Sequence, residues 1–271
     1  MEEGVNELSN DARASESLVW LLGWALVLPF AHPLRLAAYG LIPALLLVGL
    51  TVLFPDASVF SSILLSSDFN PRPLPQLVAD GSIASWIVSL VTFVVTAFLL
   101  CTWQRDIIHR FSDPLPQLLA ESFARVTEYV ILTALWALLL VGVHSRNESM
   151  ATVTVAAIMI GCFGRVAFLA PLIASRGWKA GIQGVAQIGM GRIIGSVLVF
   201  ALLLLSWTGL VFLGNHVAIS EAAAGDLRGF LIVDVKNIVV SLISLLWLSA
   251  VSALTVRISL KSKSNEADVF D

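Results

Sequence analysis

Long apolar runs separated by short polar segments dominate the pattern of this chain. The runs long enough to cross a membrane are Leu34 to Phe54, Ile83 to Trp103, Thr127 to Val143, Ala151 to Ala174, Ile193 to Gly214 and Ile238 to Val256. A helix needs about 20 mostly apolar residues to span the hydrocarbon core of a bilayer. The pattern therefore predicts an all-α, polytopic membrane bundle of six transmembrane helices.

A shorter apolar run from Leu18 to His32 precedes the first predicted span. It has no polar face, Pro29 interrupts it, and Pro33 follows directly after it. It is also shorter than the roughly 20 residues that a spanning helix requires. We expect an interfacial or re-entrant helix, with Trp20 and Trp24 at the level of the lipid headgroups.

Composition supports lipid as the solvent for most of the chain. Hydrophobic residues make up 58% of the sequence and charged residues only 13%, against roughly 25% charged residues in soluble domains. No basic domain is present that could neutralise nucleic-acid phosphates, which disfavours nucleic-acid binding. Cys101 and Cys162 both lie in apolar runs and outside any CxxC pattern, so we interpret them as small buried side chains rather than metal or redox groups.

The distribution of basic residues predicts the orientation, because cytoplasmic loops are enriched in Lys and Arg. One side of the six-span topology holds Arg13, Arg35, Arg105, Arg110, Arg125, Arg176, Lys179, Arg192, Arg257, Lys261 and Lys263. The other side holds Arg72, Arg146, Arg228 and Lys236. We therefore expect residues 1–17 to be a polar cytoplasmic N-terminus, 18–256 a single transmembrane domain, and 257–271 a cytoplasmic tail. Residues 1–17 are acidic where a secretory signal is basic, so we expect no cleavage there.

Arg165 lies inside a predicted span, whereas Arg35 stands at the start of one. It precedes Arg176 by a helical rise of roughly 15 Å, close to the middle of the membrane. A charge at this depth costs about 2.5–3.5 kcal/mol and normally faces protein or water. We therefore predict an intramembrane polar site around Arg165, with Ser206, Ser241 and Ser244 as candidate partners. Such serines are more typical as interhelical hydrogen-bond partners than as nucleophiles.

A glycine-rich segment follows Arg165 and connects two predicted spans. Its glycines share one face of a helix at positions Gly177, Gly181, Gly184, Gly191 and Gly195. Close packing against a neighbouring helix would explain this face, whereas a flexible loop that becomes helical only after Met190 fits the sequence equally well. A dinucleotide-binding motif in residues 189–195 is disfavoured, because no strand precedes it and the last glycine comes one residue late.

The same region carries a resemblance to a known group of proteins. Arg165, Pro171 six residues later, a basic turn, a segment ending in Gly-x-Gly-Arg at 189–192 and a following apolar helix resemble a set of bacterial inner-membrane proteins. These are uncharacterised six-helix families, similar in pattern to the membrane domain found beside some glycerophosphodiester phosphodiesterases. The final span, LLWLSAVSALTVRISL, is also similar, although Val185-Ala186 stands where Ala-Trp is common in these families. The resemblance implies an architecture in a bacterial inner membrane and no particular activity.

Charged residues near the predicted cytoplasmic face have two interpretations. Arg176, Lys179 and Arg192 are candidate contacts for anionic lipid headgroups, or they only fix the topology. Glu121 and Arg125 stand one helical turn apart, the spacing of a helical ion pair. The expected partners are membrane lipids and other membrane proteins.

No motif for catalysis or cofactor binding stands out. The four histidines, His32, His109, His144 and His216, lack a metal-binding pattern such as HExxH, and no G-x-S-x-G elbow occurs. We therefore expect no enzyme activity, metal or cofactor. The leading hypothesis is a non-enzymatic accessory or scaffold protein in membrane or envelope homeostasis. The alternative is a transporter or permease component that moves a lipid or small amphiphile through a polar cavity near Arg165.

Overall fold

The computed structural model describes residues 18–41, 45, 49, 83–144, 159–203 and 245–260, and none of these lies in a strand. The expected all-α class is therefore confirmed for this part of the chain. Its helices are α2 (Leu18–Ala31), α3 (Pro33–Leu36), the π-helix η1 (Ala37–Leu41), α7 (Ile83–Ile108), α8 (Leu115–His144), α10 (Val166–Val185), and three unlabelled helices at 159–163, Met190–Leu203 and Leu245–Leu260.

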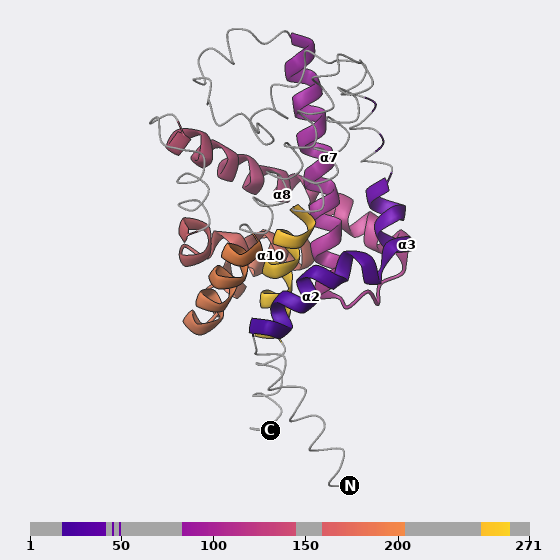
Figure 1. The fold of residues 1–271 in the computed structure, drawn as a ribbon. Helices are drawn as coiled ribbons and strands as arrows, with labels where there is room; N and C mark the ends of the chain where they lie inside the picture. Colours follow the sequence, from indigo (N-terminus) through magenta and orange to yellow (C-terminus); the bar gives the residue numbers. More distant parts are fainter. Residues whose placement is uncertain are drawn as a thin grey trace, which may run out of the picture.

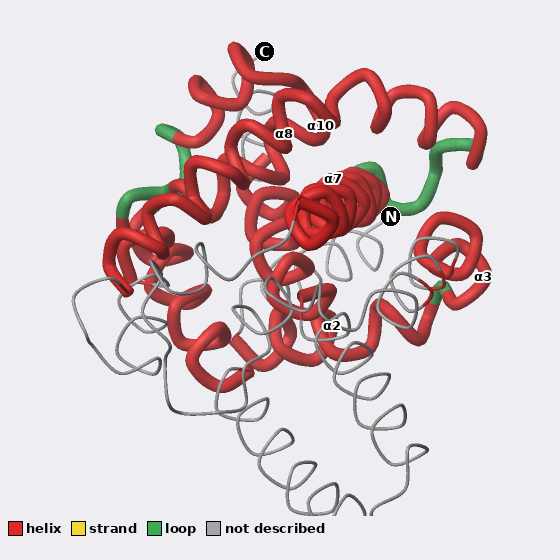
Figure 2. The backbone as a smooth tube through the Cα atoms, turned by 90° about the horizontal axis from the view of Figure 1, so that it is seen from above, coloured by secondary structure: helices red, strands yellow, loops and turns green. Residues whose placement is uncertain are grey.

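Helix α7 packs against several of the other described helices. It contacts η1, α8 and α10, and Figure 2 shows it nearly end-on among them. Of the described helices, α7 alone is long and apolar enough to cross a membrane, over Leu90–Ile108. If each of the two bent helix pairs is counted as one membrane span, the described residues hold up to three spans. Figure 1 shows α2 crossing near one end of α7.

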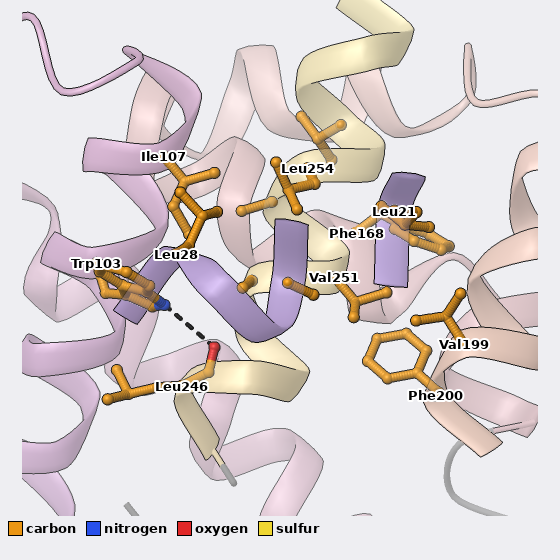
Figure 3. Close-up of a cluster of buried hydrophobic side chains, with 14 of the residues drawn as sticks. Leu21, Leu28, Trp103, Ile107, Phe168, Val199, Phe200, Leu246, Val251 and Leu254 are labelled. Atoms are coloured by element: carbon orange, nitrogen blue, oxygen red, sulfur yellow. Dashed lines mark hydrogen bonds between the residues drawn. The ribbon is translucent and has the colours of Figure 1, made fainter. Parts of the chain in front are cut away.

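The C-terminal helix, Leu245–Leu260, forms the centre of the hydrophobic core. Its residues 249–256 are all buried, which is expected of a helix that is apolar or small on every side. Leu28, Phe168 and Val199, from three other helices, belong to the same cluster (Figure 3). The indole Nε1–H of Trp103 donates to the Leu246 carbonyl at 3.1 Å, so α7 is joined to this helix by a hydrogen bond inside the core.

Three helices follow the sequence prediction with small differences in their bounds. Helix α2 ends at Ala31, one residue before the predicted end, and the chain then bends by 66° into the helix that starts at Pro33. Helix α7 continues to Ile108, beyond the predicted end at Trp103, because the polar residues that follow find partners in neighbouring helices. The third predicted span, Thr127 to Val143, belongs to a longer helix, α8, which begins at Leu115.

The fourth predicted span, Ala151–Ala174, is not a continuous helix. The helix at 159–163 stops before Arg165, which adopts a left-handed conformation (φ 62°) and is the N-cap of α10. A non-glycine residue rarely adopts this conformation. Arg165 therefore separates the helix at 159–163 from α10, whose residues 166–176 are helical.

Helix α10 is itself interrupted at Gly177, whose φ of 78° and ψ of 177° are outside the helical region. We call the resulting pair of arms, residues 166–176 and 178–185, the α10 hairpin. A Cβ built on Gly181 lies 3.2 Å from Ile173 Cγ1, and one built on Gly184 lies 3.2 Å from Leu172 Cδ2. The glycine face therefore exists in a helix up to Val185, and it packs against the other arm of the same hairpin.

The remaining predicted elements are covered only in part. The fifth predicted span, Ile193–Gly214, is described as the helix Met190–Leu203, and the sixth, Ile238–Val256, as Leu245–Leu260. The polar loop between Pro55 and Ser82 lies outside the described residues.

Candidate functional site

A group of charged side chains surrounds the C-terminal end of α7. Asp106, with 0% of its side chain exposed, forms an ion pair with Arg35 from α3. The Tyr39 hydroxyl donates to the second carboxylate oxygen of Asp106 at 3.3 Å, and Arg35 Nη2 donates to the Asp113 carbonyl at 2.8 Å. These contacts hold α3 and η1 against α7, which suits a buried carboxylate because burial without a partner is costly.

The preceding residue, Arg105, connects three helices. Its guanidinium pairs with Glu121 of α8, and its Nη1 donates to the carbonyls of Ala174 and Ser175 at 3.1 and 3.2 Å. Those carbonyls end the first arm of the α10 hairpin, where a cation is favoured by the helix dipole. Arg105 is only 4% exposed, so this contact caps a helix end inside the protein.

Glu128 caps the other side of the same break. Its Oε2 accepts the backbone N–H of Trp178 at 2.7 Å, at the start of the second arm. A carboxylate is favoured at a helix N-terminus, where backbone N–H groups lack partners. Arg125 lies beside it, with Nη1 at 3.6 Å from Glu128 Oε1. At the break at Gly177, Arg105 therefore caps the end of the first arm and Glu128 caps the start of the second.

The loop after α7 carries further contacts at this end. His109 Nδ1 lies 3.1 Å from Asp113 Oδ2, and the His32 ring stacks on Phe111 with centroids 3.6 Å apart. A hydrogen bond from Gln117 to the Glu121 carboxylate, together with the charge of Arg105, holds the pKa of Glu121 below its ordinary value.

Hydroxyl and amide groups form a second, uncharged set of contacts inside the core. Tyr129 donates to Gln104 Oε1 at 2.9 Å, and Gln104 Nε2 donates to the Ser252 hydroxyl at 3.2 Å. The hydroxyls of Ser196 and Thr255 lie 2.7 Å apart. These groups join helices to one another, which is the role that the sequence predicted for membrane serines, although at other positions.

Arg165 is the only member of the predicted intramembrane site that the structure describes, since Ser206, Ser241 and Ser244 lie outside the described residues. Its Nη1 donates to the Ala186 carbonyl at 2.8 Å. Arg165 precedes the first arm of the α10 hairpin and Ala186 follows the second, so this contact joins the two open ends of the hairpin. The side chain is half-exposed.

The three candidate lipid contacts also have defined positions. Arg176 and Lys179 are exposed and lie on either side of Gly177. Arg192 is half-buried in the helix Met190–Leu203. The expected pair of Glu121 and Arg125 is replaced by two others, because Glu121 pairs with Arg105 and Arg125 lies beside Glu128.

The charged group around α7 was not predicted from the sequence. A signal for it was present, since Arg105 and Asp106 lie two and three residues after the predicted end at Trp103, and Arg35 stands on the same predicted side. Within the described residues no set of three or more His, Cys, Asp or Glu side chains is placed to hold a metal ion. At this end of α7, described side chains form ion pairs and cap helix ends. No protein-family model, curated protein or solved structure matches the chain.

Proposed function

We propose that this chain is a non-enzymatic integral protein of a bacterial inner membrane, with an accessory or scaffold role in membrane or envelope homeostasis. The observation that carries the proposal is the division of α7 into an exposed apolar part and a buried end with paired charges. Ile83, Ile87 and Leu90 are 81%, 58% and 63% exposed. In contrast, residues 101–107 are buried, including Arg105 and Asp106.

Lipid explains the exposed part of α7 better than water does. Val91 and Val94 continue the exposed apolar surface, and Ile131 and Leu135 of α8 are also more than half exposed. Large exposed apolar patches mark contacts with membranes or other proteins. This surface supports the assignment of α7 to a membrane-spanning helix within the six-span topology.

The contacts at the other end of α7 support the proposed orientation. Arg35 pairs with Asp106, Arg105 with Glu121, and Arg257 Nη1 lies 3.4 Å from the Ile107 carbonyl. The positive-inside pattern assigns all three arginines to the cytoplasmic side. Their meeting at one end of α7 is what that topology, with both termini in the cytoplasm, requires.

A scaffold role is favoured over transport because the charged groups near the helix breaks are used in holding helices together. Arg105, Glu128 and Arg165 each bind a backbone group of the α10 hairpin or its flanks. The hairpin is also the observation that favours the alternative, since transporters build their sites from interrupted helices. A transporter for a lipid or small amphiphile is therefore the second candidate function.

Cysteine labelling of the full-length protein in cells tests the membrane assignment. Cys101 and Cys162 are 0% and 1% exposed, so introduced cysteines stand out above a low background. Ile83 is the first residue of α7 and Ser112 lies beyond its last residue, Ile108, and both side chains are exposed. We expect labelling of Ser112→Cys from the cytoplasm and of Ile83→Cys from the outside. Labelling of both from one side, or release of the protein by alkaline carbonate, contradicts the assignment.

Purification in mild detergent separates the two candidate functions. A polypeptide that stays bound at a constant ratio supports the scaffold role. A small amphiphile that stays bound, and is lost from a folded Arg165→Leu protein, supports the transporter instead and overturns the scaffold proposal.

A further inference from the structure

Two arginines outside the paired group meet at the Ile107 carbonyl. This oxygen accepts the backbone N–H of Arg110 at 3.2 Å and lies 3.4 Å from Nη1 of Arg257. Arg110 belongs to the loop after α7, and Arg257 to the C-terminal helix. The backbone of one arginine and the guanidinium of the other are therefore close together at the charged end of α7.

No carboxylate of the described chain compensates these two charges. Three of its four carboxylates have other partners, since Asp106 pairs with Arg35, Glu121 pairs with Arg105, and Glu128 accepts the backbone N–H of Trp178. The fourth, Asp113, has Oδ2 at 3.1 Å from His109 Nδ1. Burial, and after it the positive charge of Arg110, hold the pKa of Arg257 below its ordinary value. An arginine remains charged at physiological pH nonetheless, so within the described residues these two positive charges have no carboxylate partner.

The backbone at this point is held in an unusual conformation. Arg110 and Phe111 have φ values of 56° and 59°, in a left-handed region where a helix end usually has glycine. The Phe111 N–H donates to the Asp106 carbonyl at 2.9 Å, and its ring stacks on His32. Such conformations cluster at functional sites, and here the surrounding contacts fix an arginine where glycine is the common residue.

We propose that Arg110 and Arg257 form a binding site for a phosphate group. A guanidinium offers several N–H donors in a fork that matches phosphate oxygens, and its bonds to an anion are stronger than neutral ones. Arg110 is exposed and Arg257 is half-buried, so the site is open to an incoming group and has one wall inside the protein. The phosphate belongs either to a lipid headgroup or to a free ion, and the lipid source rests on the proposed membrane function.

The test uses full-length protein in a neutral detergent, with thermal unfolding as the readout. Inorganic phosphate and dihexanoyl phosphatidylglycerol are titrated separately, at ionic strength matched with chloride. We expect stabilisation by at least one of them, and weakening of its apparent affinity by about tenfold or more in Arg110→Gln and in Arg257→Gln. Arg125→Gln removes one positive charge from the same end of the protein and should keep the affinity within about twofold of the parent, because surface charge contributes little.

The two titrations identify the source of the phosphate. Stabilisation by inorganic phosphate alone assigns the site to a free ion, and stabilisation by the lipid assigns it to a headgroup. If either glutamine variant fails to fold, Arg110→Lys and Arg257→Lys replace it, and we expect weaker binding because lysine keeps the charge but lacks the fork.

Two results overturn the site. One is equal weakening in Arg110→Gln, Arg257→Gln and Arg125→Gln, which shows diffuse surface charge, and the other is no stabilisation by either compound. Alkaline carbonate extraction of the parent protein is independent of these variants. A protein that resists extraction but ignores both compounds refutes the phosphate site and leaves the proposed membrane function intact.

Discussion

Replacing Asp106 by asparagine tests whether the charged end of α7 stabilises the fold. Asparagine keeps the size of the side chain and one acceptor oxygen but removes the charge that pairs with Arg35. The Asp106 side chain is 0% exposed, whereas that of Arg35 is 26% exposed. Removing one partner of a buried ion pair costs about 3–5 kcal/mol. We expect a loss of about 3 kcal/mol, at the lower end, because Arg35 keeps partial access to solvent and its bond to the Asp113 carbonyl.

Glu121→Gln is the matched comparison for this experiment. Glu121 also pairs with an arginine, Arg105, but the Glu121 side chain is 42% exposed. The buried Arg105 keeps its bonds to the carbonyls of Ala174 and Ser175 and has Asp113 Oδ2 at 3.8 Å. We therefore expect a smaller loss of stability, because the charge left behind still has acceptors. Thermal unfolding of the full-length protein in neutral detergent, followed by tryptophan fluorescence, measures both variants. We expect Asp106→Asn to lower the midpoint by several degrees more than Glu121→Gln does.

A double-variant cycle separates the ion pair from other effects of the substitution. Arg35→Met alone leaves Asp106 buried and without its cation, so we expect it to be at least as destabilising as Asp106→Asn. Together the two changes should cost less than the sum of their separate effects, by a coupling of about 0.5–3 kcal/mol. Additive effects, or equal effects of Asp106→Asn and Glu121→Gln, would refute the view that a buried ion pair holds α3 against α7.

Three further results are expected from the same unfolding assay. Gly177→Ala should cost about 1–3 kcal/mol of stability, because Gly177 has a φ of 78° and an added Cβ would lie 2.9 Å from Arg125 Cζ. The control Gly189→Ala should have little effect, since an added Cβ there meets nothing within 4 Å. Equal unfolding midpoints for the two variants would contradict the break in α10. Gly181→Leu should destabilise far more than Ile182→Leu, since Ile182 is 47% exposed, and similar small effects would mean that the two arms do not pack. Folding lowers the pKa of Glu121, so its carboxylate stabilises the fold above the ordinary pKa of 4.5, and this stabilisation is lost as the pH falls through the lowered value. The difference in unfolding midpoint between the parent protein and Glu121→Gln should therefore shrink on acidification. A difference that grows would contradict the lowered pKa.

The helices themselves could be predicted from the sequence wherever the local pattern of apolar residues and prolines determines where a helix begins and ends. The run from Leu18 to His32 gave a helix that ends at Ala31, since Pro33 cannot continue the same hydrogen-bond pattern and its ring restricts the residue before it. The apolar run from Ile83 gave α7, although its end lies five residues later than Trp103. That extension depends on Asp106 and its neighbours finding partners in other helices, which no local pattern contains.

The charged group around α7 could not be predicted because its pairs join distant parts of the chain. Arg35 and Asp106 are 71 residues apart in sequence, and Arg105 and Glu121 are 16 apart. Local spacing instead suggested the pair of Glu121 and Arg125 within one helix. Such pairs contribute only about 0.2–0.5 kcal/mol, so a better partner in another helix readily replaces them.

The breaks at Arg165 and Gly177 show why a charge inside an apolar run need not mark a substrate site. A broken helix exposes carbonyl and N–H groups that an apolar environment cannot satisfy, at about 1–3 kcal/mol for each unpaired group. Arg165 supplies a donor to Ala186, and Arg105 and Glu128 close the two arms at Gly177. A transport cycle that moved substrate through this region would have to release these bonds and form them again at every turn. The use of these bonds to hold the α10 hairpin supports the proposed scaffold role over that of a moving gate.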